Sequence, residues 1–120
     1  MLMLPQSVRI KLFVGATDMR KGFDGLSALV AAAGEDVFSG HLYVFVSRRR
    51  DRAKILSFHR GGFVLWYKRL EQGTFKLPSS ESQALSIDAG QLAMLLDTAD
   101  FEEVHRSEAW APKVPKTSKE

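Results

Sequence analysis

Basic side chains gather in the middle of the sequence at a spacing that suits contact with phosphate groups. Five positive charges fall within residues 48–54, where Asp51 is the single acid. A guanidinium group offers parallel N–H donors that match phosphate oxygens, and each phosphate contact on DNA releases counterions. We therefore predict a nucleic-acid-binding surface made of Arg48, Arg49, Arg50, Arg52, Lys54, Arg60, Lys68 and Arg69.

The same basic run has a second interpretation, which the composition leaves open. A charged hairpin tip can be merely solvated, and its charge keeps a sheet edge from pairing with other chains. Aromatic residues near the run can stack on bases, as they do in single-strand binders. They lie in stretches that are apolar on both faces, which favours a place in the core for most of them: Phe58, Phe63, Trp66 and Tyr67.

The residue types needed for catalysis or metal binding are sparse. The sequence has no cysteine, no phosphate-binding P-loop and no paired-histidine zinc helix. Its histidines stand apart from one another at positions 41, 59 and 105. Asp18 suits a helix cap better than a metal pair with Asp24, and Asp97 and Asp100 suit an acidic helix end. We therefore expect a protein with no enzyme activity, no metal and no cofactor.

Length and charge set the frame for these residues. The chain has 120 residues, of which 45% are hydrophobic and 26% charged, the proportions of a globular domain. Residues 1–76 hold 13 basic and 6 acidic residues, whereas residues 77–120 hold 4 and 8. This asymmetry predicts a basic face and an acidic end. We expect one cytoplasmic domain over residues 1–104, a polar disordered tail over 105–120, and no association with membranes.

Hydrophobic periodicity indicates the elements that position the basic residues. Alternating or doubly apolar runs predict strands over 8–14, 42–46, 53–59 and 63–70, with a short strand over 74–77. Helical spacing predicts helices over about 23–33 and 87–98. Gly61 and Gly62 predict a hairpin turn, and Gly34 fits the end of the first helix.

This order predicts an α+β domain, β-α-β-β-β-(β)-α, in which two helices cover a mainly antiparallel sheet. Thr17 and Asp18 are the predicted N-cap candidates of the first helix, and Ser86 is that of the second. Both helices need a sheet face, so we expect a single shared core that contains Phe23, Leu26, Val44, Phe45, Ile55, Leu65, Leu92 and Leu96.

Residues 17–26 read T-D-M-R-K-G-F-D-G-L. They resemble the signature of TnpB, the second-frame accessory protein of insertion sequences of the sixty-six type, which is distinct from the RNA-guided nuclease of the same name. Further matching blocks are residues 38–45, the arginine-rich run through Lys54, residues 68–71 with Gly73 and Phe75, and residues 91–96. The resemblance covers residues 4–101 in collinear order.

The resemblance implies a bacterial accessory protein that supports transposition, brings no catalytic residues and works beside a separate transposase. Its expected partners are DNA at the transposon ends, the transposase and the other accessory protein of the same element. Its expected location is the cytoplasm, on the nucleoid when bound to DNA.

Two functional hypotheses follow for this chain. The first is phosphate binding through the arginine run, and the second is a module that docks onto the transposase without touching DNA. Arg20 and Lys21 lie in the signature and are the residues we expect to face a partner. His59 stands where the family usually has Asp, and Leu77 stands where it usually has Trp, so this copy departs from the pattern at two positions.

Overall fold

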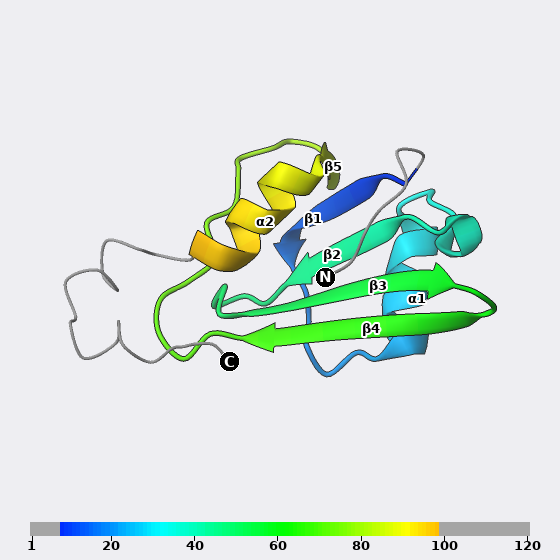
Figure 1. Cartoon of the computed structure of the whole chain (residues 1–120), viewed down its shortest axis with the longest axis horizontal. Helices are drawn as coiled ribbons and strands as arrows, with labels where there is room; N and C mark the ends of the chain where they lie inside the picture. The colour runs from blue at the N-terminus through cyan, green and yellow to red at the C-terminus, as the bar shows by residue number, and fades with distance from the viewer. Residues whose placement is uncertain (1–7, 99–120) are drawn as a thin grey trace.

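Strand pairing gathers the local elements of the chain into a five-stranded sheet with helices on both faces (Figure 1). The computed structural model describes residues 8–98. The strands are β1 (Ile10–Ala16), β2 (Leu42–Val46), β3 (Arg52–His59), β4 (Gly62–Arg69) and β5 (Ala84–Ile87). The helices are α1 (Phe23–Ala32) and α2 (Ala89–Thr98), with a short 3-10 helix η1 (Val37–Ser39). The predicted α+β class is confirmed.

The sheet has the order β4-β3-β2-β1-β5 and is antiparallel except at one pair. β1 and β2 run parallel, with Leu12 beside Val44 and Phe13 beside Phe45, and α1 forms the connection between them. Because parallel neighbours end at the same edge of a sheet, the loops that follow β1 and β2 emerge side by side. This pair determines where the basic residues meet.

The fifth strand does not lie where the sequence predicted it. Residues 74–77 form no strand: the backbone N–H of Phe75 donates to the carbonyl of Arg50, in the turn after β2, at 2.7 Å, and the Phe75 side chain is fully buried. The apolar alternation there reflects packing into the core. β5 pairs instead with β1, with Ile10 opposite Ile87.

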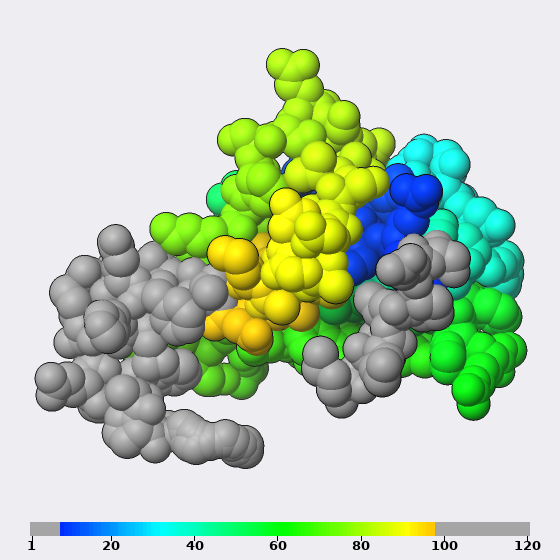
Figure 2. Space-filling view, turned by 45° about the horizontal axis from the view of Figure 1, so that its top comes forward, coloured from blue at the N-terminus to red at the C-terminus, as the bar shows by residue number. Residues whose placement is uncertain are grey.

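The predicted single core is wrong, because the sheet separates two cores. Leu92 of α2 packs with Val44 and Ile55 on one face, whereas Leu26 of α1 packs with Phe45 on the other. Alternate residues of a strand point to opposite faces, so β2 contributes to both cores. Of the predicted core residues, Leu65 and Leu96 are partly buried against their respective clusters, and Phe23 is 45% exposed. In Figure 2 the yellow and orange α2 lies across one face, beside the blue of β1.

The helix ends differ from prediction at the N-termini and agree at the C-terminus of α1. Neither Thr17 nor Asp18 is a helix cap, since α1 starts after Gly22 without a side-chain cap. Ser86 is not the cap of α2 either. Asp88 accepts from the N–H of Gln91 at 2.7 Å, and the Gln91 side chain accepts from the N–H of Asp88. This reciprocal pair satisfies the backbone N–H groups of Asp88 and Gln91 at the start of α2. Gly34 ends α1 with a φ of +81°, as predicted.

The expectation that the aromatic residues of the hairpin are mostly core is wrong for two of them. Trp66 is 41% exposed and Tyr67 49% exposed. They lie on β4, an edge strand with a neighbour on one side only. Phe58 and Phe63 are partly buried and contact each other with ring centroids 5.2 Å apart. The helices therefore cover the centre of the sheet more fully than β4.

The predicted tail over residues 105–120 lies outside the described residues, as do Asp100 and His105. Within residues 8–98 no helix combines the length and the apolar character needed to cross a bilayer.

Candidate nucleic-acid interface

The turn between β2 and β3 holds the predicted arginines in a fixed conformation. We call residues 47–52 the arginine turn. Its first residue, Ser47, donates its backbone N–H to the carbonyl of Arg52 at 2.9 Å, and its hydroxyl accepts from the N–H of Arg52 and donates to Asp51. Arg50 adopts a left-handed φ of 62° that closes the turn.

The side chains of the arginine turn project into solvent. All four of its arginines are exposed, as the sequence predicted: Arg48, Arg49, Arg50 and Arg52. Asp51 is the one acid in the turn, and its carboxylate already accepts from the Ser47 hydroxyl at 3.2 Å. The turn is also anchored to the segment after β4, since Leu70 donates its backbone N–H to the Asp51 carbonyl at 2.7 Å. A rigid loop with unneutralised guanidinium groups is the result.

The arginine turn forms one wall of an open groove of about 650 Å³, and the loop after β1 forms the other. The two walls face each other because β1 and β2 are parallel and end at the same edge. The lining comprises Ala16, Thr17, Asp18, Met19, Arg20, Ser47, Arg48, Arg49, Asp51 and Arg52. Four arginines and two aspartates give this groove a positive balance.

The loop after β1 contributes a tightly held pair to the groove. Asp18 accepts from Arg20 Nη2 at 2.8 Å, from Arg20 Nε at 3.1 Å and from the Arg20 backbone N–H at 2.9 Å. The Arg20 side chain nevertheless remains 92% exposed. Arg20 is thus exposed, as contact with a partner requires, and its role toward a partner stays a prediction.

The Asp18 carboxylate should titrate at unusually low pH. Hydrogen bonds from the Arg20 side chain, and then from its backbone N–H, hold the pKa of Asp18 well below its ordinary range. A carboxyl with a lowered folded-state pKa contributes stability above its unfolded pKa of about 3.9, and this contribution is lost as the pH falls through the folded-state value.

We expect an NMR titration to find Asp18 still charged at a pH of about 3, where solvated carboxyl groups are mostly protonated. Arg20→Ala should return the pKa of Asp18 toward its ordinary range. An ordinary titration of Asp18 in the unmodified protein would show that the pair does not form.

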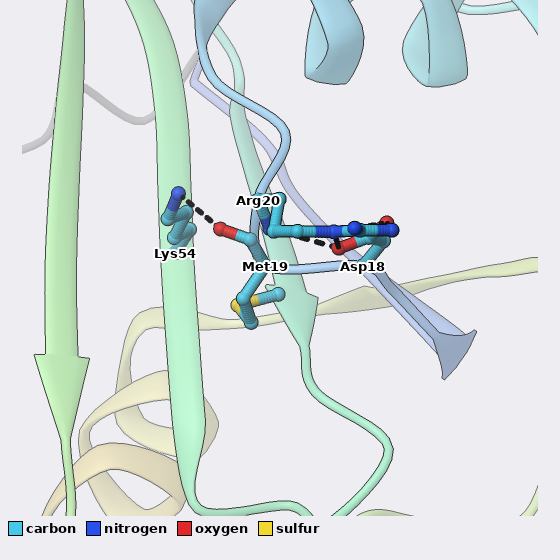
Figure 3. A network of polar contacts seen from close by, with 4 residues as sticks. All are labelled: Asp18, Met19, Arg20 and Lys54. Carbon is cyan, nitrogen blue, oxygen red and sulfur yellow. Dashed lines mark hydrogen bonds and ion pairs between the residues drawn. The ribbon is translucent and has the colours of Figure 1, made fainter.

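Lys54 holds the loop after β1 from the side of the sheet. Its ammonium donates to the carbonyl of Met19 at 2.8 Å (Figure 3) and to the carbonyl of Lys21 at 2.9 Å. It also lies 5.3 Å from the centre of the Tyr67 ring. The predicted phosphate ligand therefore points into the molecule and positions the groove. Lys21 is half-buried, with its side-chain stem against Gly25, where an added Cβ would approach it to 3.0 Å.

The structure does not bring the remaining predicted residues into one surface. Lys68 lies opposite Ala53 on the α2 face and donates to the Leu96 carbonyl at 2.8 Å, whereas Lys54 lies on the α1 face. β3 runs about 23 Å from Arg52 to His59 at the usual strand rise, so Arg60, in the turn that follows, sits at the far end of the hairpin.

Arg69 stays near the arginine turn, because it is the cross-strand partner of Arg52. Its guanidinium pairs with Glu71 at 3.2 Å, and its side chain is 57% exposed. Sequence reasoning named Arg20 but missed that it lies across the groove from the arginine turn, that Thr17 beside it is buried at 8% exposure, and that Asp18 pairs with it. Within residues 8–98 no group of three or more His, Asp or Glu side chains is placed to hold a metal ion.

The comparison with known families decides the biological setting. The model of the family described as IS66 Orf2 like protein matches residues 8–106. This chain belongs to the IS66 Orf2-like family. The resemblance drawn from the signature at residues 17–26 is therefore confirmed, and membership makes the chain an accessory protein of an insertion sequence.

Two curated relatives, both from Sinorhizobium fredii (strain NBRC 101917 / NGR234), extend this similarity over most of the chain. Uncharacterized protein y4hO is 37% identical over 113 residues, which is 92% of this chain and 96% of the relative. Uncharacterized protein y4jC is 31% identical over 108 residues, 89% and 92% of the two chains. No solved structure matches this IS66 Orf2-like chain.

Proposed function

We propose that this IS66 Orf2-like protein is a non-catalytic accessory factor that supports transposition by binding the phosphates of DNA at the transposon ends. The observation that carries this proposal is the arginine turn, in which four guanidinium groups are exposed on a loop fixed by its own hydrogen bonds. Its proposed partners are DNA, the transposase and the other accessory protein of the element. It acts in the bacterial cytoplasm and on the nucleoid when bound to DNA.

The charges around the groove support phosphate as the ligand. Both aspartates of the lining already have partners within the protein, Asp18 in Arg20 and Asp51 in the Ser47 hydroxyl. Arg48 and Arg49 have no acidic partner among the described residues. Exposed arginines of this kind gain more from a phosphate than from water, because guanidinium forks match phosphate oxygens and counterions are released.

A mobility-shift titration of the purified protein tests this function directly. Duplexes carrying a transposon end and duplexes of random sequence are titrated at several salt concentrations, with and without the transposase. We expect binding without the transposase, of broadly similar strength on both duplexes, that weakens steeply as salt rises. No shift of either duplex at low salt would overturn the proposal.

The edge of the sheet favours a second candidate function, docking onto the transposase. β4 has a neighbour on one side only, and Val64, Trp66 and Tyr67 on this strand are 41–49% exposed. An edge strand with exposed apolar side chains can pair with a strand of a partner. In the same titration this second function predicts a DNA shift only when the transposase is present.

A further inference from the structure

Arg20 differs from the arginines of the groove's opposite wall in being held by a carboxylate. Asp18 contacts its Nε and Nη2 atoms at 2.8–3.2 Å and also its backbone N–H. These contacts use the inner edge of the guanidinium. Nη1 donates no hydrogen bond to any described residue, so the outer edge, with Nη1 and the second hydrogen of Nη2, is open to a ligand on a side chain that is 92% exposed.

The backbone that carries Arg20 is fixed independently of this pair. Lys54 donates to the carbonyls on both sides of Arg20, those of Met19 and Lys21. The Lys21 N–H donates to the Asp18 carbonyl at 3.1 Å, and the Thr17 N–H to the Val46 carbonyl at 2.9 Å. Figure 3 shows Lys54 reaching the loop from one side, while Arg20 and Asp18 extend together toward the other. Arg20 is therefore set in position before any ligand binds.

The fold does not depend on the Asp18–Arg20 pair for its stability. An ion pair as exposed as this one contributes little to stability, yet it fixes the direction of a long, flexible side chain. The pair also changes what Arg20 can bind. Asp18 offsets its charge and would repel a phosphate, so the Coulombic reason for phosphate binding is weak here, while two directional N–H donors remain.

We propose that Arg20, positioned by Asp18, recognises a guanine in the major groove of duplex DNA while the arginine turn holds the adjacent phosphates. The major-groove edge of guanine presents the O6 and N7 acceptors, which an outward guanidinium edge meets with two parallel hydrogen bonds. Guanine is uncharged, so the Asp18 carboxylate does not oppose it. This inference rests on the proposed function, since it requires that the protein bind DNA.

Selection from a library of random-sequence duplexes tests the inference with the full-length protein. We expect the unmodified protein to enrich guanine at one fixed position and to prefer guanine over adenine there by about 5–150-fold, the range for a bidentate base contact. Replacing that guanine with 7-deazaguanine removes the N7 acceptor and should abolish most of the preference.

Four variants separate base reading from phosphate binding and from a structural role. Arg20→Ala and Arg20→Lys should both lose the guanine preference, and Arg20→Lys should keep the salt dependence because it keeps the charge. Arg48→Ala, the matched control, should keep the preference and flatten the salt slope by about 0.9. Asp18→Asn should lower the preference yet tighten binding to random DNA, because it removes a negative charge. A loss of structure cannot produce that opposite pair of changes.

The outcomes also distinguish failure of this inference from failure of the proposed function. Binding to DNA without a guanine preference, or a preference that persists in Arg20→Ala, overturns the role of Arg20 and leaves phosphate binding intact. A salt slope about 0.9 flatter in Arg20→Ala but not in Arg20→Lys, with the base preference unchanged, assigns Arg20 to a phosphate instead. No binding to any duplex overturns both proposals.

Discussion

A variant with alanine at Arg48, Arg49, Arg50 and Arg52 is expected to lose most of its affinity for DNA. If each arginine neutralises one phosphate, the plot of log affinity against log salt should flatten by up to about 3.6. The loss should be similar on transposon-end and random duplexes, because phosphate contacts carry no sequence information. Titrations at a series of salt concentrations measure both quantities.

The same titrations need a control for charge alone. Arg60→Gln removes an exposed charge at the other end of the hairpin and should change the salt slope little. The fold of the quadruple variant should persist, since exposed charges contribute modestly to stability. A folded quadruple variant with unchanged affinity and slope would rule out phosphate contact by the arginine turn. If that variant lost transposase binding instead, docking would become the preferred function.

Separate truncations in the two cores should destabilise the protein independently. Leu26 of α1 is completely buried against one face of the sheet. Leu92 of α2 is 9% exposed and packs against the opposite face. Each change to alanine should lower the free energy of unfolding by about 2–5 kcal/mol, from lost burial and the cavity left behind. Because the side chains share no cluster, the double variant should show the sum of the two losses to within about 0.5 kcal/mol.

Denaturant unfolding measures these losses. Val64→Ala, at a half-exposed position on β4, is the control and should change the free energy of unfolding by about 0.5 kcal/mol or less. A coupling energy well above about 1 kcal/mol between Leu26 and Leu92 would contradict two cores separated by the sheet. A small loss in the free energy of unfolding for Leu92→Ala alone would mean that α2 does not pack tightly against the sheet.

Local sequence patterns predicted the elements whose signals are local. β2 has the predicted bounds, and β1, β3, β4 and α1 start or end within two residues of prediction. The hairpin turn lies at Arg60 and Gly61, both with positive φ, one residue before the predicted pair of glycines. β5 was missed, because a run of four residues gains its strand character from pairing with β1, more than 70 residues away.

The candidate site was likewise predicted only where its features depend on local sequence. Exposure of the arginine turn follows from its own composition, since one Asp51 cannot neutralise four guanidinium groups. The groove depends on the parallel pairing of β1 and β2, which brings Arg20 next to residues nearly 30 positions away. The placement of Lys54 and Lys68 on opposite faces of the sheet could have been predicted from the sequence. A two-residue turn places even positions of β3 opposite odd positions of β4, so these two lysines must face opposite sides of the sheet.

The pairing of β1 with β5 has a consequence for the growing chain on the ribosome. β1 is synthesised before every other described strand, yet its second neighbour is complete only when Ile87 has been synthesised. Until then β1 presents one row of unpaired backbone groups, a template for intermolecular pairing. The hairpin of β3 and β4 can form from neighbouring segments well before β5 pairs with β1. Translation that stops before residue 84 therefore leaves the longer strand β1 as an aggregation-prone edge, whereas a stop after α2 leaves the edge to β5, a strand of only four residues.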